Sequence, residues 1–432
     1  MTDHHDHHHD LKISTDTVQT GGLAKIALGA AVVGLAAFAG LGIANMGSAG
    51  DFGLRDFFLT YLCGFVFWAS IPFGAVFLML VGILTSASWG VVLRRCFLAA
   101  IKTMPILALL FIPVAVSLFV VEGKQSPYWW SDASWEGDVN VVAKEKGLRF
   151  EAIQENQHKI HDIMNPYAYL AISLFAFGAV GGMGYAAAAV SRKSEEEKDL
   201  KAYETLRKFA GPGVAIWVLT MTITCTLWVM SVEPTWASSM FPIVFGMNAF
   251  LTTLSFCIFT FYTVNADKAD TMAIVKDKFR IDIGTFTLAI TMVWAYASFS
   301  QYMLIWAGNL PEEITYYRKR GDHGWEYLAY FLMAFHWLIP FVTLLFREVK
   351  TNPTAMRVMC VLLFTVCAAD VIWWIVPCVP HETAVLHVPM AVAAIVGVGG
   401  IWGFFFLNNL SKKAALPANH EGEFLATWGE HH

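Results

Sequence analysis

The sequence predicts an all-α integral membrane protein with ten transmembrane helices. Hydrophobic residues make up 56% of the chain and charged residues only 15%, fewer than the roughly 25% that is usual in soluble domains. Ten apolar runs have the length of about 20 residues that a helix needs to cross a bilayer core. Most Lys and Arg residues fall in the connections on one side of these runs.

The predicted elements follow one another along the whole chain. A His-rich tail, residues 1–22, comes first, and a second tail, residues 411–432, comes last. Between them the ten predicted spans are 23–44, 57–84, 97–121, 166–190, 209–230, 240–261, 283–306, 325–346, 356–379 and 386–410.

The distribution of positive charge predicts the orientation of these spans. Of the 29 Lys and Arg residues, twenty lie on the side that also contains both chain ends. An excess of these cations marks the cytoplasmic face of a membrane protein. We therefore expect both tails to be cytoplasmic and the long loop 122–165 to lie on the periplasmic side.

A weak internal symmetry predicts how the spans group. Spans two to five and spans six to nine both start outside and both carry their longest outer loop between their second and third members. Each set ends in an outer turn that places a carboxylate near a proline, SVEP or VPHE. We expect two four-helix bundles, 57–230 and 238–379, with the spans 23–44 and 386–410 peripheral to them.

Several chemistries are excluded by residue type and spacing. The seven cysteines are scattered through apolar runs without the spacing of zinc, iron–sulfur or c-type haem sites. Only His336 among 14 histidines lies deep in a span, whereas a transmembrane haem needs paired axial histidines. We predict no metal site, no cofactor bound by this chain itself and no nucleic-acid surface, and we interpret the N-terminal HHDHHHD as a solvated tail.

Asp370 lies in the middle of the apolar run FTVCAADVIWWIVP. A carboxylate near the bilayer centre costs at least about 2.5 kcal/mol, so it is usually kept only where it faces protein or water. His336 in the preceding span lies at nearly the same depth, because a helix rises about 1.5 Å per residue. Pro340 lacks an N–H group and leaves the carbonyl of His336 without its helical donor. We interpret Asp370 and His336 as candidates for a proton route.

Other polar residues extend this candidate route toward either face. Ser298 and Tyr302 share a helix face at i, i+4, and Glu233 lies at a nearby outer turn. Asp282 begins the seventh span on the inner side. The alternative is that the hydroxyl groups bond the neighbouring backbone and the boundary carboxylates are solvated caps.

A quinone is a second candidate ligand for the seventh span. Quinone binding needs a hydrogen-bonding side chain at each ring carbonyl within an aromatic, apolar pocket. The candidates for such a pocket are Trp294, Tyr296, Tyr302 and Trp306.

The predicted outer loops combine Trp and Tyr with carboxylates, as in SPYWWSDASWEGD at residues 126–138. This composition is typical of an interfacial aromatic belt. It equally suits a docking surface for an extracytoplasmic protein partner.

Two segments carry a resemblance to a known family. The stretches SVEPTWASSMFPIVFGMNAFLTTLSF, residues 231–256, and FSQYMLIWAGNLPEEITYYRKR, residues 299–320, resemble the NrfD-like (polysulfide reductase membrane-subunit) family of quinone-interacting membrane subunits. That family includes the membrane subunits of bacterial alternative complex III. The resemblance covers about residues 23–410.

The resemblance implies a subunit of a quinol:electron-carrier oxidoreductase in the bacterial cytoplasmic membrane. It implies iron–sulfur clusters and haem c in partner subunits, and quinol or menaquinol oxidised in a second, related membrane subunit. The chain would then support the complex and conduct protons, without catalysing a reaction itself. Two alternatives stay open, namely a quinone-binding subunit that itself hosts quinol oxidation and a self-contained proton-coupled transporter.

Overall fold

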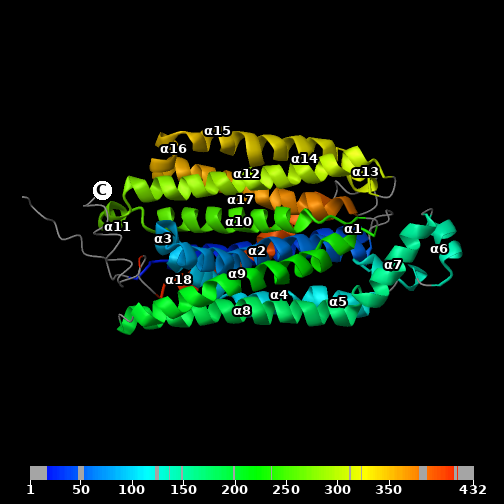
Figure 1. Ribbon diagram of the computed structural model, residues 1–432, viewed down its shortest axis with the longest axis horizontal. Coiled ribbons are helices and arrows are strands. Elements are labelled where there is room, and N and C mark those ends of the chain that lie inside the picture. Colours follow the sequence, from blue (N-terminus) through cyan, green and yellow to red (C-terminus); the bar gives the residue numbers. More distant parts are fainter. Residues whose placement is uncertain are drawn as a thin grey trace, which may run out of the picture.

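The computed structural model describes residues 17–46, 53–121, 126–135, 137–146, 149–197, 200–234, 236–310, 313–322, 324–378, 387–412 and 416. Long helices run side by side along one direction (Figure 1). We call the end of the molecule that carries Arg94, Arg95 and Arg347 the inner end, and the opposite end the outer end.

The all-α, multi-span architecture is confirmed. Nine helices of the described residues are long and apolar enough to cross a membrane, and one bent helix pair, counted as a single span, makes ten. The nine are contained in α1 (Gly21–Met46), α2 (Leu54–Thr85), α8 (Pro166–Glu197), α9 (Leu200–Trp228), α10 (Phe241–Val264), α12 (Asp277–Gly308), α14–α15 (Trp325–Leu345, with the π-helix η5, Met333–Leu338), α17 (Pro353–Ile375) and α18 (Val388–Leu410).

The third span differs from the single helix predicted over residues 97–121. It begins earlier, as α3 (Ser88–Ile101), bends by 43° and continues through α4 (Met104–Leu110) and α5 (Ile112–Val120). The bend precedes Pro105, which cannot donate a helical hydrogen bond and disfavours helical geometry in the residue before it. The predicted span left Arg94 outside, whereas this residue lies within α3 and is buried, with 4% of its surface exposed.

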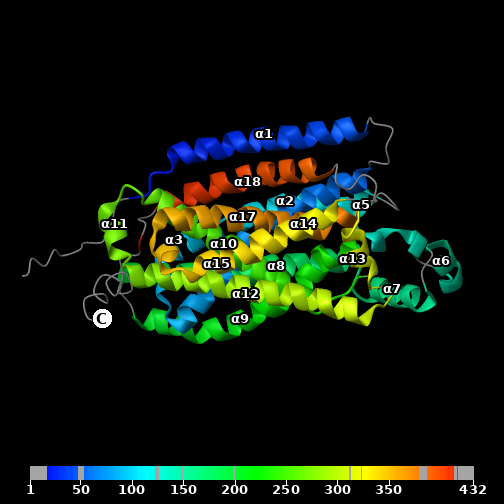
Figure 2. The ribbon, with the colours of Figure 1, turned by 90° about the horizontal axis from the view of Figure 1, so that it is seen from above.

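The spans pack around two central helices. Helix α2 contacts α3, α8 and α9, whereas α10 contacts α12 and α17, and α2 and α10 contact each other. Helix α18 packs on α2, and α1 packs on α18 at the edge of the molecule (Figure 2). The hydroxyl of Thr20 donates to the carbonyl of Leu407 at 3.1 Å, so α1 begins where α18 ends.

The outer connections contain short elements that fold back onto the bundle. They are η2 (Trp129–Ser131), η3 (Ala133–Trp135), α6 (Val139–Lys146), α7 (Phe150–Asp162), η4 (Met230–Val232), α13 (Thr315–Arg320) and η6 (Val376–Cys378), while α11 (Ala269–Ile274) and α16 (Arg347–Thr351) lie at the inner end. Trp129, Trp130 and Trp135 are buried. The three tryptophans of this loop therefore pack within the chain.

Candidate functional site

Asp370 lies where three spans of the second group meet. Only 2% of its surface is exposed. Its Oδ2 atom accepts hydrogen bonds from the Trp294 indole at 2.9 Å and from the Asn248 amide at 3.0 Å. Helices α17, α12 and α10 each contribute one of these residues, so the carboxyl group is solvated by protein donors in place of water.

His336 completes this cluster from a fourth helix. Its ring stacks on that of Trp294 with 3.6 Å between centroids. Its Nδ1 atom lies 3.8 Å from Oδ2 of Asp370 and has no hydrogen-bond partner among the described residues. Its Nε2 atom lies 3.7 Å from Sγ of Cys367. The imidazole and the carboxyl group are thus neighbours that lack a short direct hydrogen bond.

The backbone around His336 explains how this side chain faces inward. Residues Met333–Leu338 form a π-helix, and the N–H of Ile339 donates to the carbonyl of Ala334. Pro340 follows and cannot supply the usual donor to the carbonyl of His336. Single π-turns within α-helices are frequent at functional sites, and this one leaves His336 with no exposed surface.

Asn248 was not predicted as a site residue. A polar amide within the apolar run of α10 is the feature that could have identified it. Its Oδ1 accepts a hydrogen bond from Thr252 at 3.3 Å. Its Nδ2 donates to the carbonyl of Cys367 at 3.3 Å as well as to Asp370. These contacts fix the orientation of the amide, with its N–H groups toward Asp370.

The outer candidates form a separate group. Glu233 is buried and pairs with Lys319 through N–O distances of 2.7 and 2.9 Å. Gln301 accepts from Ser238 at 3.0 Å and donates to the hydroxyl of Tyr317 at 3.1 Å. Burial raises the pKa of Tyr317 to about 12, so this hydroxyl keeps its proton at neutral pH.

Ser298 and Tyr302 are at the edge of this outer group. The Oγ atom of Ser298 is buried without a hydrogen-bond partner among the described residues. Tyr302 is 42% exposed and packs edge-to-face on the ring of Tyr317. Tyr302 thus touches the group through Tyr317, whereas the hydrogen bonds within the group are those of Gln301 with Ser238 and Tyr317.

Arg320 anchors α13, part of the second motif, to the end of α17. Its guanidinium group donates to the carbonyls of Trp373 and Trp374 at 3.0 and 2.8 Å and lies 3.5 Å from the ring centroid of Tyr316. The last carbonyls of a helix have no partner within it and carry partial negative charge. A fully buried Arg320 therefore caps the helix that holds Asp370.

The inner candidate Asp282 accepts a hydrogen bond from Ser88 at 3.1 Å. Above it, the hydroxyl groups of Thr287 and Thr291 donate to helix carbonyls four residues earlier at 2.9 Å. Both threonines have no exposed surface.

The four quinone-pocket candidates are not brought together. Trp294 is buried against Asp370 and His336. Tyr296, Trp306 and Tyr302 are 71%, 60% and 42% exposed on α12, so they lie at the surface whereas Trp294 is buried.

A second histidine and aspartate lie together at the outer end. Nε2 of His387, before α18, is 3.8 Å from Oδ2 of Asp56 in the first turn of α2. The same oxygen accepts the backbone N–H of Gly53 at 3.0 Å. Asp56 was not predicted as a site residue, because a carboxylate in the first turn of a helix is usually a cap. Asp56 is indeed such a cap, since it accepts the N–H of Gly53.

The part of the chain that the structure describes contains no candidate metal site. No group of three or more His, Cys, Asp or Glu side chains there could hold an ion. All seven cysteines are buried and free. The HHDHHHD segment lies outside the described residues.

No protein-family model matches this chain, and no curated protein matches its sequence. The fold and the site define a multi-pass integral membrane protein with an ionisable cluster buried in one group of spans.

Proposed function

We propose that this protein is the ActF-like membrane subunit of a bacterial alternative complex III, and that Asp370 and His336 form a proton-transfer site within it. One observation carries the proton-transfer role. A carboxyl group and an imidazole are buried side by side in the middle of apolar spans, 3.8 Å apart. Ionisable residues in such positions typically mark proton relays or ion pathways.

The geometry supports transfer between the two side chains. Trp294 and Asn248 donate to Oδ2 of Asp370, which favours its anionic form. A protonated Asp370 can instead donate to the unpartnered Nδ1 of His336 after a shift of less than about one ångström, since a hydrogen bond needs a separation of about 2.7–3.2 Å. The proton then resides on the imidazole, and no electron moves.

The resemblance of residues 231–256 and 299–320 to the NrfD-like family supports the assignment to a complex. In that assignment an ActC-like membrane subunit hosts quinol oxidation, and an iron–sulfur subunit and multihaem cytochrome c subunits carry the electrons. This chain contributes span packing and a proton route to the assembly. Copurification with haem c and iron–sulfur polypeptides tests this part of the proposal, and isolation of a stable chain without them contradicts it.

The experiment on the site uses Asp370→Asn in the intact complex in sealed vesicles. We expect quinol oxidation to continue and proton translocation per electron to fall, because the amide cannot take up or release the proton. Asp277→Asn is the matched control, since this carboxylate is 59% exposed at the inner end. Unchanged translocation would remove Asp370 from the route. Loss of quinol oxidation with assembly intact would instead place quinol chemistry at this site.

A further inference from the structure

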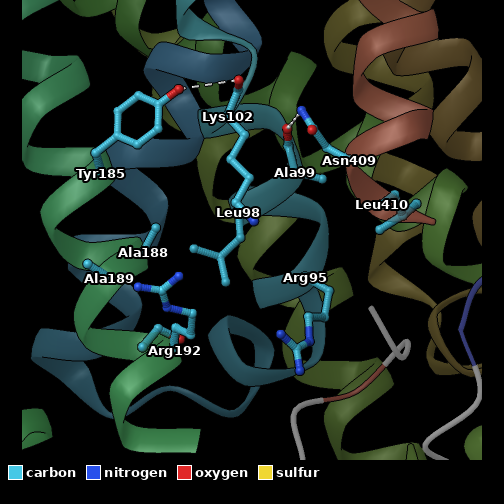
Figure 3. Close-up of a pocket in the computed structure, with 11 residues that line it drawn as sticks. Arg95, Leu98, Ala99, Lys102, Tyr185, Ala188, Ala189, Arg192, Asn409 and Leu410 are labelled. Carbon is cyan, nitrogen blue, oxygen red and sulfur yellow. Dashed lines mark hydrogen bonds between the residues drawn. The ribbon is translucent and has the colours of Figure 1, made fainter. Parts of the chain in front are cut away.

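A cavity of about 220 Å³ lies at the inner end between α3, α8 and α18 (Figure 3). Its volume is well above the about 15 Å³ that one water molecule needs. It is separate from the cluster around Asp370, and it plays no part in the proposed proton route.

Positive charge dominates the polar side of this cavity. Arg95, Lys102 and Arg192 line it, and no carboxylate is among its described lining residues. Figure 3 shows Lys102 and Arg192 directed toward the same hollow. Three cations around one cavity favour an anionic ligand, because each cation near a membrane surface contributes about 1 kcal/mol to binding anionic lipid.

A buried hydroxyl group provides an independent sign of a ligand. Ser191 lines the same cavity and is 3% exposed. Its Oγ atom has no hydrogen-bond partner among the described residues. Buried polar groups are usually hydrogen-bonded, and a phosphate oxygen in the cavity would accept the proton of this hydroxyl.

The remaining wall distinguishes a lipid from a soluble anion. Leu98, Ala188 and Leu410 make part of the lining apolar, and the cavity lies near the inner ends of membrane-spanning helices. A phospholipid places its headgroup at this level and its acyl chains alongside the spans. We infer that this cavity binds the headgroup of an anionic phospholipid of the inner leaflet.

The test measures the lipid that the full chain retains. The protein, with any accompanying subunits, is first placed in nanodiscs of phosphatidylcholine and phosphatidylglycerol and is then purified from them. Native mass spectrometry should show phosphatidylglycerol bound to the wild type. The double variant Lys102→Gln, Arg192→Gln should weaken this binding about tenfold or more. Arg357→Gln, which removes a cation of α17 outside the cavity, should retain the lipid as the wild type does.

A second variant separates the cavity from general surface charge. Ala188→Leu fills the hollow and leaves all three cations in place, so it should also lose the lipid while its melting temperature stays near that of the wild type. Retention of phosphatidylglycerol by either the double variant or Ala188→Leu would overturn the inference. Displacement of the lipid by millimolar inorganic phosphate would also overturn it, because a free anion would then be the preferred ligand.

Discussion

At the scale of single residues, Asp370 is a buried carboxyl group with dedicated hydrogen-bond donors. Its two donors come from different helices, and one of them, the Asn248 amide, also donates to the carbonyl of Cys367. A buried carboxylate without such donors would be strongly destabilising. The donors therefore satisfy the buried carboxyl group, while the unpartnered Nδ1 of His336 can accept a proton from it.

Trp294→Phe removes one of these donors and keeps an aromatic ring beside His336. We expect the free energy of unfolding to fall by about 1–3 kcal/mol, because Asp370 is left with an unmet acceptor site. Thermal unfolding of the purified protein measures this loss. Trp337→Phe is the control, since the N–H of Trp337 has no hydrogen-bond partner among the described residues and the same ring volume is removed. Equal losses in the two variants would show that packing alone accounts for the effect.

The pairing of Asp370 with His336 was predictable from sequence, and its other partners were not. Depth follows from the residue count along each span, because the helical rise is constant. Predicting which side of a helix faces the protein interior requires polar residues that recur on one side. Spans that are apolar all round lack this pattern. Trp294 was therefore assigned to a quinone pocket with Tyr296, although the two residues face opposite sides of α12.

At the scale of elements, α1 depends on one close crossing with α18. A Cβ atom on Gly34 would overlap the backbone of Gly397, and one on Gly400 would overlap that of Ala31. Small residues allow such close approach of helices in membranes, where hydrophobic burial between helices adds little. Much of the rest of α1 is exposed, as expected of a helix that also faces lipid.

Gly34→Ala should loosen this crossing. Backbone atoms cannot rotate away as a side chain can, so we expect a cost of about 1–3 kcal/mol from overpacking. Gly29→Ala is a matched control on the same helix, because a Cβ atom there meets nothing within 4 Å. Cross-linking between cysteines placed on α1 and α18, together with the melting temperature, measures the effect. Identical behaviour of the two variants would contradict the close crossing.

Element boundaries show a second limit of prediction from sequence. Apolar length located the ten spans, but it placed the start of the third span at residue 97, after Arg94 and Arg95. The structure places Arg94 within α3 and buries it. Pro105, in contrast, was a local signal for the bend that the prediction of one continuous helix did not use.

At the scale of the whole molecule, the number of spans and the charge distribution are independent arguments for one orientation. An even number of spans returns the chain to its starting side, and the contact of Thr20 with Leu407 joins the start of α1 to the end of α18. The excess of Lys and Arg on that side predicts that it faces the cytoplasm. If the bent pair α3–α5 re-entered the membrane without crossing it, the spans would number nine, and Thr20 and Leu407 would belong on opposite sides of the membrane, contrary to their contact.

Labelling with a membrane-impermeant maleimide distinguishes these topologies. All seven native cysteines are buried, so the background is low and single introduced cysteines are readable. We expect Gln154→Cys, exposed on α7, to be labelled in intact cells, and Glu348→Cys, exposed on α16, to react only after permeabilisation. Nine crossings would reverse the faces of both Gln154→Cys and Glu348→Cys relative to α1 and α2, so a cysteine at exposed Leu54 would then lie on the opposite side from Gln154→Cys. Labelling of Leu54→Cys and Gln154→Cys under the same condition therefore supports two crossings between them, by α2 and by the complete bent pair.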